Sequence, residues 1–428
     1  MDHDDLDLDH DSATPPPPPP QSPTEPHLHA TNPDRAALIL RACRDADLHQ
    51  LRAFATEQGG LLDDDVRREA WPLLLGSSAS SSSSSSVDWT TTLPPHRDEQ
   101  QVKLDVNRSF VYYPNDQTDD QIALRKEELF SVIAQVLRRH PLLCYFQGYH
   151  DIVQVFLLVL GPSLAVPAIT RLSLLRIRDF MLPSLDAAIA HLNLLPAIIY
   201  SVDPALCHHL RPTQPFFALA ATITMYAHDI QSYGDIARLF DFLLSREAVF
   251  SVYLFAAIIL ARRPELMAIP ADEPEILHFT LSKLPSPLDL ESLIADSDAL
   301  FARSPPESLP FRAWGKVSQY SVLKTTRDPQ GLTTQSLAAA EELFELHEAQ
   351  VRRAKAVQAL ARGVKLGLYR YRRPAGGLGL AVAVGVLAWW LGRNPESFHS
   401  YTSMIRLGAS HLGANTRQIF AVFVGQFR

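Results

Sequence analysis

The chain has 428 residues, of which 46% are hydrophobic and 20% are charged, values typical of a globular protein that can bury a substantial core. Its formal net charge of -8 at pH 7 argues against a general nucleic-acid binder, because such proteins need a basic face to neutralise phosphates. Three widely separated cysteines, Cys43, Cys144 and Cys207, form neither a disulfide framework nor a zinc-ligand spacing, which favours a protein that faces the reducing cytosol.

The N-terminal segment, residues 1–31, has a composition that does not fold by itself. An acidic run at 2–11 is followed by a proline run at 15–20, and neither can bury enough apolar surface to offset the entropy lost on folding. We therefore expect a disordered acidic and proline-rich tail. A serine-rich stretch at 76–98 predicts a disordered loop between helices for the same reason.

The rest of the chain is dominated by apolar residues at helical spacing. Folded structure is expected to begin at Asn32, an N-cap residue type, with Pro33 at the first helical position. No stretch alternates with a period of two, and there is no glycine-rich phosphate loop or fixed repeat. The sequence predicts an irregular, all-α, multi-helix fold. Helices are expected at residues 63–75, 119–139, 164–181, 185–200, 215–230, 233–245 and 247–261.

Residues 102–110 place Asp105 and Arg108 three positions apart in a segment that can be helical. Residues three apart are neighbours on one face of a helix, whereas Val102 and Val106 lie on another face and can be buried. An arginine held by a nearby carboxylate and still able to reach outward is suited to meeting a phosphate. An isolated Asp-x-x-Arg is more often an ordinary surface ion pair, so its meaning depends on the rest of the chain.

Gln147 is the residue that completes a chemical set with Arg108. Neither side chain titrates usefully near neutral pH, so the pair is poorly suited to acid-base catalysis. It is well suited to nucleotide hydrolysis, in which a guanidinium neutralises charge on the transferring phosphoryl group and a carboxamide orients the attacking water. The two residues therefore indicate phosphoryl-transfer chemistry.

An alternative is a helical phosphohydrolase with a metal site built from histidine and aspartate pairs. Such pairs on helices can hold two metal ions. The residues at these positions show no dedicated ligand spacing, and the histidines could equally be capped or half-buried. We therefore expect no metal site. The residues concerned are His140, the pair His150 and Asp151, and the pair His228 and Asp229.

The C-terminal part begins with a predicted linker and charged stalk helix at 311–374. Residues 375–391 are uncharged and apolar, follow a basic flank and end near Trp389 and Trp390. This length suffices for a thin bilayer, and the one-sided basic flank predicts a transmembrane helix with the large N-terminal part in the cytosol. The alternative is a buried core helix. Residues 392–428 are expected to be a short tail.

Four motifs in chain order, spread over residues 32–310, resemble those of TBC-domain GTPase-activating proteins for Rab GTPases. Asp105-x-x-Arg108 is similar to the first finger motif of that family, and the stretch from Tyr145 to Gln147 is similar to the second. The C-terminal apolar segment and the residues that follow Gln147 are most similar to those of the family branch anchored in the endoplasmic reticulum. The two flanking motifs are Arg68-x-x-Trp71-Pro72-x-Leu74-Leu75 and Arg238-Leu239-Phe240-Asp241-Phe242-Leu243.

This resemblance implies a TBC domain in which Arg108 and Gln147 are the arginine and glutamine fingers, inserted into the nucleotide site of a Rab GTPase. It implies that Asp105 and Tyr145 position the fingers. It also implies no cofactor of the chain's own, because GTP and magnesium are bound by the Rab. The net charge of -8 adds the expectation of no nucleic-acid partner.

The same resemblance implies Rab GTPases of early secretory traffic as partners and a place in the membrane of the endoplasmic reticulum or the Golgi. The domain would then face the cytosol. A catalytically idle TBC scaffold, which tethers a GTPase at the membrane without accelerating hydrolysis, is the alternative from another class. Retention of both Arg108 and Gln147 favours the activator, because a scaffold has no need for that pair.

Overall fold

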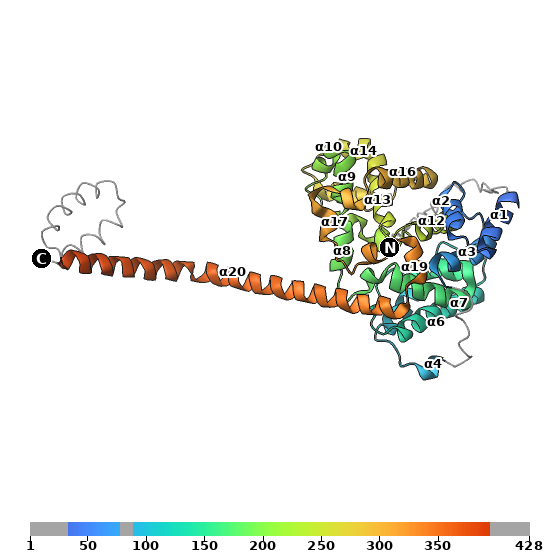
Figure 1. The fold of residues 1–428 in the computed structure, drawn as a ribbon, viewed down its shortest axis with the longest axis horizontal. Coiled ribbons are helices and arrows are strands. Elements are labelled where there is room, and N and C mark those ends of the chain that lie inside the picture. The colour runs from blue at the N-terminus through green and yellow to red at the C-terminus, as the bar shows by residue number, and fades with distance from the viewer. Residues whose placement is uncertain (1–32, 78–88, 394–428) are drawn as a thin grey trace, which may run out of the picture. The chain divides into compact units, whose positions relative to one another are not determined.

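The computed structural model describes residues 33–77 and 89–393, with the side chains of 329, 330 and most residues between 365 and 392 left out. Within these ranges the secondary structure consists of helices and turns without a β-strand, which confirms the predicted all-α fold (Figure 1). The predicted tail at 1–31 and the residues beyond 393 lie outside the described part, as do residues 78–88 of the predicted serine-rich loop.

Helices of the first half form at the positions where apolar spacing and capping residues coincide. α3 begins after Asp63, whose carboxylate accepts the Val66 N–H at 3.0 Å, and α6 begins with a capping box between Thr118 and Gln121. Both confirm the predicted ranges to within one residue. The helices are α1 (Pro33–Arg44), α2 (Leu48–Thr56), α3 (Asp64–Leu75), α4 (Trp89–Thr92), α5 (Glu99–Val106), α6 (Asp119–Arg139) and α7 (Tyr149–Leu175).

Shorter elements make up the second half. The helix predicted at 233–245 is confirmed by α12 (Tyr233–Ser245), whereas the one predicted at 185–200 is divided into two. The elements are η2 (Arg178–Met181), α8 (Asp186–Leu192), α9 (Leu195–Val202), α10 (Pro204–His209), η3 (Pro215–Ala218), α11 (Leu219–Ile223), α12, α13 (Phe250–Ala261), α14 (Arg263–Ala268), α15 (Pro274–Leu281), α16 (Leu290–Arg303), η4 (Pro306–Ser308), η5 (Pro310–Arg312), α17 (Ala313–Lys316), α18 (Val322–Thr325), α19 (Pro329–Thr334) and α20 (Leu337–Arg393).

The prediction of a disordered loop at 76–98 is wrong for its second part. Residues 89–92 form α4, and the Arg138 guanidinium donates to the backbone carbonyls of Thr90 at 3.2 Å and Leu93 at 3.3 Å. The same guanidinium stacks over the Trp89 ring. These contacts come from Arg138 of α6, which is 48 residues after Thr90 and 45 after Leu93, so the composition of the loop could not reveal them.

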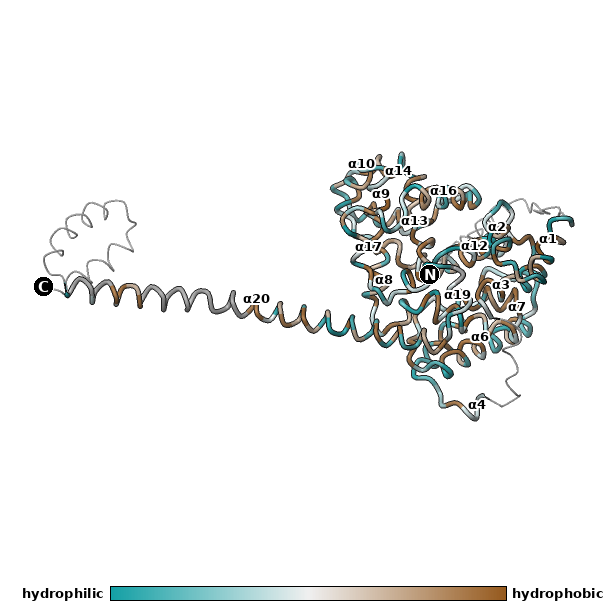
Figure 2. The backbone as a smooth tube through the Cα atoms, in the orientation of Figure 1, coloured by the Kyte–Doolittle hydropathy of each residue, from teal (hydrophilic) through white to brown (hydrophobic). Residues whose placement is uncertain are grey.

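α7 is the central helix of the core; it contains most of the helix predicted at 164–181 but begins earlier, at Tyr149. Gly161, with φ 69°, and Pro162 break its regular geometry near the middle. Within the described residues, it is the one helix long and apolar enough to cross a membrane, and 67% of its most apolar 18-residue stretch is buried inside the protein. Figure 2 colours the backbone by hydropathy and labels α7 among the neighbouring helices α3 and α6. Burial by α3 and α6 explains this composition.

A buried carboxylate connects the first and last of the sequence motifs. Asp241 of α12 is fully buried and accepts hydrogen bonds from Arg67 Nε at 3.1 Å and Trp71 Nε1 at 2.8 Å, both on α3. It also accepts the Leu61 N–H at 3.1 Å. Arg68, the arginine of the motif, instead donates to the Val159 carbonyl at 3.2 Å. The two motifs therefore hold α3 against α12 (Figure 1).

The first compact unit of the chain extends to Glu348, beyond the domain limit predicted at 310. Val322 and Phe344 are almost fully buried in it. At the start of α20, His347 lies 3.5 Å from the buried carboxylate of Asp179. Residues predicted to belong to a linker and stalk therefore complete the core of this unit.

The predicted stalk and membrane segments belong to one helix, α20. The backbone of residues 375–391 is helical, while most of their side chains lie outside the described set. Among the described side chains here, Val382, Val384, Val386 and Trp389 are exposed to solvent. The transmembrane assignment remains a prediction.

Candidate functional site

Arg108 lies in a turn after α5 and not on the helix itself. α5 ends at Val106, Asn107 is its C-cap, and the Arg108 N–H donates to the Asp105 carbonyl at 2.9 Å. Val102 and Val106 are buried, as predicted. The expectation that Asp105 and Arg108 share an exposed helix face is wrong, because only the Asp105 carboxylate remains in the helix and it points into the protein, where the residue is 4% exposed.

Gln147 lies in the loop between α6 and α7, directly before a glycine that the local backbone requires. Gly148 is the N-cap of α7 and has φ 98°, a conformation that residues with a side chain rarely adopt. A Cβ at this position would lie 2.5 Å from Cγ2 of Thr224. Tyr149, the next residue, is fully buried and contacts Ser173 through its hydroxyl at 2.7 Å. The turn therefore buries both following residues and leaves Gln147 exposed.

A hydrogen bond between Tyr145 and Asp105 ties the two finger segments together. The Tyr145 hydroxyl donates to Oδ2 of Asp105 at 2.9 Å, and Gln101 Nε2 donates to Oδ1 at 3.0 Å. The Tyr145 N–H donates to the Asp98 carboxylate at 2.9 Å. Burial raises the pKa of Tyr145 well above its usual range, and the negative charge of Asp105 adds to this shift, so the phenol remains a donor.

This geometry corrects the predicted role of Asp105. Its carboxylate does not hold the Arg108 guanidinium; it holds Tyr145, which is two residues before Gln147. Within the described residues, the hydrogen bond between Asp105 and Arg108 is a backbone one, in which the Asp105 carbonyl accepts the Arg108 N–H. The structure therefore brings Asp105 and Tyr145 together as a link between the two segments, a contact that the sequence did not predict.

The side chains of Arg108 and Gln147 are both exposed. Within the described part of the chain, neither the guanidinium nor the carboxamide forms a hydrogen bond or ion pair. Five guanidinium donors and a carboxamide, without an internal partner, can bind an anion and orient a water molecule. The arrangement lacks a group that would act as a general base near neutral pH, so it suits charge neutralisation and positioning.

Large apolar side chains surround Arg108 in the sequence and face solvent. Leu104 is 51% exposed, Val111 is 72% exposed and Tyr112 is 50% exposed. The exposure of these residues could not be predicted from the sequence, because an apolar side chain next to a helix end is usually buried. Exposed apolar side chains grouped around polar groups are typical of a protein-binding surface.

The histidines considered for a metal site do not lie together: His140 is in one place, and His150 and His228 are in another. His140 contacts Glu341 of α20 through Nδ1 at 2.6 Å. His150 and His228 both contact the Asp151 carboxylate, at 3.2 Å and 3.0 Å. Within residues 33–77 and 89–393, no group of three or more histidine, cysteine, aspartate or glutamate side chains is arranged to hold a metal ion. The geometry thus does not support the alternative phosphohydrolase site.

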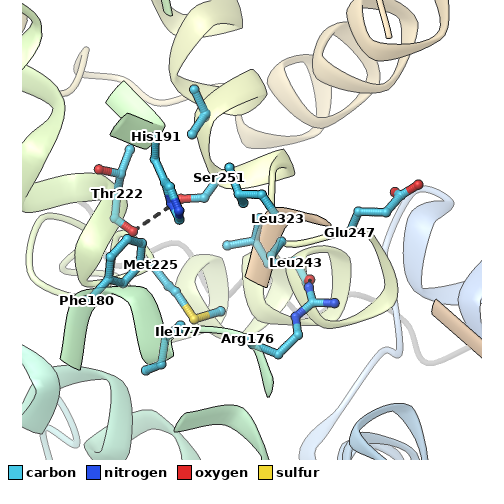
Figure 3. Close-up of a pocket in the computed structure, with 12 residues that line it drawn as sticks. Arg176, Ile177, Phe180, His191, Thr222, Met225, Leu243, Glu247, Ser251 and Leu323 are labelled. Atoms are coloured by element: carbon cyan, nitrogen blue, oxygen red, sulfur yellow. Dashed lines mark hydrogen bonds between the residues drawn. The ribbon is translucent and has the colours of Figure 1, made fainter. Parts of the chain in front are cut away.

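A small enclosed cavity lies elsewhere in the fold, between α12, α13 and the segment that follows α7 (Figure 3). Its volume is about 30 Å³, which can hold water but is far below the roughly 300–1,000 Å³ of pockets for small organic ligands. Ser251 at its wall donates to the Thr222 carbonyl at 3.3 Å. This cavity cannot hold a nucleotide.

An open cleft of about 500 Å³ lies beside the loop between α6 and α7, with Tyr145 and Phe146 of that loop in its wall. Its other lining residues include Arg97, Leu182 and Leu185. The cleft lies at the surface, so a partner could reach it together with Gln147. The chemically suited residues therefore lie on an open surface, as expected for action on another macromolecule.

Comparison with known proteins gives a consistent family match. The model of the Rab-GTPase-TBC domain matches residues 64–267, a range that contains Arg108 and Gln147. "TBC1 domain family member 20" of Bos taurus is 36% identical over 274 residues, which cover 61% of this chain and 65% of that protein. This chain thus spans about 65% of the length of the first curated relatives.

A second relative is matched over most of its length. "GTPase-activating protein gyp10" of Schizosaccharomyces pombe is 33% identical over 320 residues, covering 73% of this chain and 84% of that protein. Among solved structures, the "Ypt/Rab-GAP domain of Gyp1p" aligns with a TM-score of 0.47 and 16% identity, covering 60% of this chain and 92% of that one.

Proposed function

The chain belongs to the Rab-GTPase-TBC domain family, and on that premise we propose that it accelerates GTP hydrolysis on a Rab GTPase of early secretory traffic. The observation that carries the proposal is the pair of exposed side chains, Arg108 and Gln147, that lack an internal partner in the described residues. Their segments are joined by the Tyr145 to Asp105 hydrogen bond, which limits how far one can move from the other.

Each finger has a separate chemical role in this proposal. The Arg108 guanidinium enters the nucleotide site of the Rab and neutralises the charge that develops on the γ-phosphoryl oxygens. The Gln147 carboxamide accepts from and donates to the attacking water, which it holds in line with the phosphoryl group. GTP and magnesium belong to the Rab, and the chain supplies no cofactor of its own.

The exposed apolar residues Leu104, Val111 and Tyr112 fit both this activator and a catalytically idle scaffold. Either protein needs an adhesive surface for the GTPase. Only the activator needs a guanidinium and a carboxamide whose hydrogen-bonding capacity is unused. The unpartnered state of Arg108 and Gln147 therefore favours the activator.

Single-turnover hydrolysis tests the proposal. The full chain in detergent is mixed with a panel of purified Rab GTPases loaded with GTP, and phosphate release is followed. We expect Arg108→Ala to lower the stimulated rate by roughly 10³- to 10⁵-fold, the usual contribution of an arginine finger, and Gln147→Ala to lower it strongly as well. Arg303→Ala, on the exposed side of α16, is the control and should retain the wild-type rate.

Two outcomes would contradict the activator. Equal acceleration by wild type, Arg108→Ala and Gln147→Ala would remove both residues from the reaction. Binding of GTP-loaded Rab without acceleration by the wild type, across the panel, would instead support the scaffold. Circular dichroism of each variant shows whether the helical fold is retained.

We further propose that residues 375–391 anchor the chain in the membrane of the endoplasmic reticulum or the Golgi, with the domain in the cytosol. Support comes from the helical backbone there and from the exposed, apolar Val382, Val386 and Trp389. Wild-type protein should stay in the membrane pellet after carbonate extraction, and deletion of 375–391 should release it. Deletion of the 1–31 tail is the control that should not. Retention after deletion of 375–391 would exclude this anchor.

A further inference from the structure

His150 makes a contact that gives the Tyr145 to Asp105 link a third member. Its Nδ1 lies 3.0 Å from the Tyr145 hydroxyl oxygen. The single hydrogen of that hydroxyl is donated to Asp105, so this contact is a hydrogen bond only when Nδ1 of His150 carries a hydrogen and donates it. The phenol of Tyr145 is then held from both sides.

The network continues from His150 toward the surface. Nε2 of His150 lies 3.2 Å from Oδ1 of Asp151, and Oδ2 of Asp151 contacts Nδ1 of His228 at 3.0 Å. The side chains of His150 and Asp151 are 11% and 17% exposed, whereas that of His228 is 62% exposed. When the ring is neutral with its hydrogen on Nδ1, the approach of Nε2 to Asp151 is a close contact without a hydrogen bond; only the doubly protonated ring donates to both partners, and burial lowers the pKa of His150. Close polar contacts therefore run from a buried carboxylate on α5, through the first turn of α7, to a surface histidine beyond α11.

The segment that carries His228 also contacts the turn formed by Gln147 and Gly148, which we call the glutamine turn, at a second point. Thr224 donates its hydroxyl to the Ala220 carbonyl at 2.8 Å, which fixes its side chain. Its Cγ2 occupies the place that a Cβ on residue 148 would need, at 2.5 Å. Residues 224–228 thus contact α7 at Gly148 and at Asp151, immediately after Gln147.

We propose that His150, Asp151 and His228 are positioning residues for GTPase activation, and that they hold Tyr145 and the first turn of α7 so that Gln147 stands in its working orientation. This inference rests on the proposed function above. None of the three touches the nucleotide; they act through Tyr145 and through the backbone on either side of Gln147.

The position of the network in the chain supports this role over a purely structural one. Tyr145 precedes Gln147 by two residues, and His150 follows it by three, so the polar contacts bracket the exposed carboxamide. Burial of such a network costs free energy that an apolar cluster would not cost, and it gives little net stability in return. What it does give is a defined direction for each side chain, which a glutamine that must orient a water molecule requires.

The decisive experiment compares His150→Leu with His150→Asn in the full chain in detergent. An asparagine amide nitrogen can take the place of Nδ1 and donate to Tyr145, whereas leucine cannot. The stimulated rate is measured in single turnover against the chain concentration, on the Rab that responds most to wild type. We expect His150→Leu to lower the maximal rate about 10-fold, within the roughly 10²-fold that a misplacement of about 1 Å can cost. The half-saturating concentration should not change, and His150→Asn should recover most of the rate.

His140→Leu is the matched control. The His140 side chain is 12% exposed, almost as buried as His150, and it also contacts a carboxylate, that of Glu341. A general effect of deleting a buried histidine on folding should lower the melting temperature of both variants. Only loss of positioning should lower the maximal rate of His150→Leu alone.

Tyr145→Phe provides a second variant in case His150→Leu does not fold. If both residues act through one hydrogen bond, the double variant Tyr145→Phe with His150→Leu should lose no more rate than the more damaging single variant. Multiplicative losses, or a wild-type maximal rate for folded His150→Leu and Tyr145→Phe, would overturn the inference while leaving the activator intact. Absence of acceleration by wild type would overturn both.

Discussion

Two aspartates, Asp241 and Asp105, stand at the centres of the two hydrogen-bond networks that the motifs build, and they serve different ends. Asp241 is fully buried, and each of its partners, including Arg67 and Trp71, is itself buried in the core. Asp105 is also buried, but its network leads through Tyr145 to the segments of Arg108 and Gln147, whose side chains have no partner in the described residues.

The difference separates a motif that maintains the fold from one that performs chemistry. Both contain an arginine and an aspartate, and both resemble family motifs, so residue type does not tell them apart. In the Asp241 network the polar groups are satisfied within the chain, which leaves them nothing to offer a partner. In the Asp105 network the buried part is satisfied and the outermost donors are left unused, which is the condition for binding something outside the chain.

Among the variants that test this comparison, Asp241→Ala should cause the largest loss of stability. Among the described residues, this change leaves the buried Arg67 guanidinium with Asp64 as its one remaining counter-ion and deprives Trp71 of its acceptor. Breaking a buried pair from one side costs about 3–5 kcal/mol of the free energy of unfolding. Urea denaturation followed by circular dichroism measures the loss.

Glu69→Ala, an exposed carboxylate on the same helix, is the control and should change the urea midpoint little. Arg108→Ala should likewise leave the midpoint unchanged while abolishing stimulated hydrolysis. The comparison would fail if Asp241→Ala unfolded at the wild-type urea concentration, or if Arg108→Ala were as destabilising as Asp241→Ala.

Gly148→Ala has an intermediate expected effect and tests how closely the glutamine turn is held. The new methyl group would meet Thr224, and the φ of 98° is unfavourable for alanine. Such backbone strain costs about 1–3 kcal/mol, and the displaced turn should lower the maximal stimulated rate as well. Melting temperature and single-turnover rate are measured together.

Gly161→Ala separates these two causes. Gly161 also has a positive φ, 69°, but nothing lies within 4 Å of its added Cβ. We expect this control to lose stability and to retain the stimulated rate. If Gly148→Ala kept the wild-type rate despite a lower melting temperature, the orientation of Gln147 would not depend on this turn.

The smallest expected effect concerns pH and the outer end of the Asp105 network. The hydrogen bond with Asp151 raises the pKa of His228 above its ordinary value of 6.5, despite an opposing effect of partial burial. The titratable groups near it are Asp151, Asp229 and His150, and burial lowers the pKa of His150. A raised pKa means that the stabilising contribution is complete below pH 6.5 and is lost as pH rises through the folded-state pKa.

Wild-type protein should therefore lose melting temperature relative to His228→Gln as the pH rises above 6.5, and its stimulated rate should fall by no more than about two-fold, because an exposed pair contributes little. His228→Gln should show no such relative change. If the melting temperatures of wild type and His228→Gln changed in parallel with pH, the contact between His228 and Asp151 would contribute nothing to stability in solution.

Much of the fold follows from local patterns. Capping residues and apolar spacing predict α3, α6 and α12 almost to the residue, since these features act within a few positions of the chain. The longer-range arrangement does not follow. The packing of α4 against Arg138 and the inclusion of Phe344 in the core depend on contacts between distant segments, which composition does not encode.

For the site, the sequence by itself determined which chemistry is available. Arg108 and Gln147 form a set for charge neutralisation and water positioning whatever their surroundings, because a guanidinium and a carboxamide keep their charge state near neutral pH. The burial of Val102 and Val106 was likewise evident from their spacing.

Only the tertiary structure decided what holds that chemistry in place. The Asp105 carboxylate turns away from Arg108 to Tyr145, and His150 and His228 meet at Asp151 beside the glutamine turn. The physical reason is that a hydrogen bond needs its two atoms within about 3 Å, and residues forty to eighty positions apart reach that distance only when their helices pack. Local sequence cannot specify such a pair, since it is the packing of α5, α7 and the segment after α11 that selects each partner.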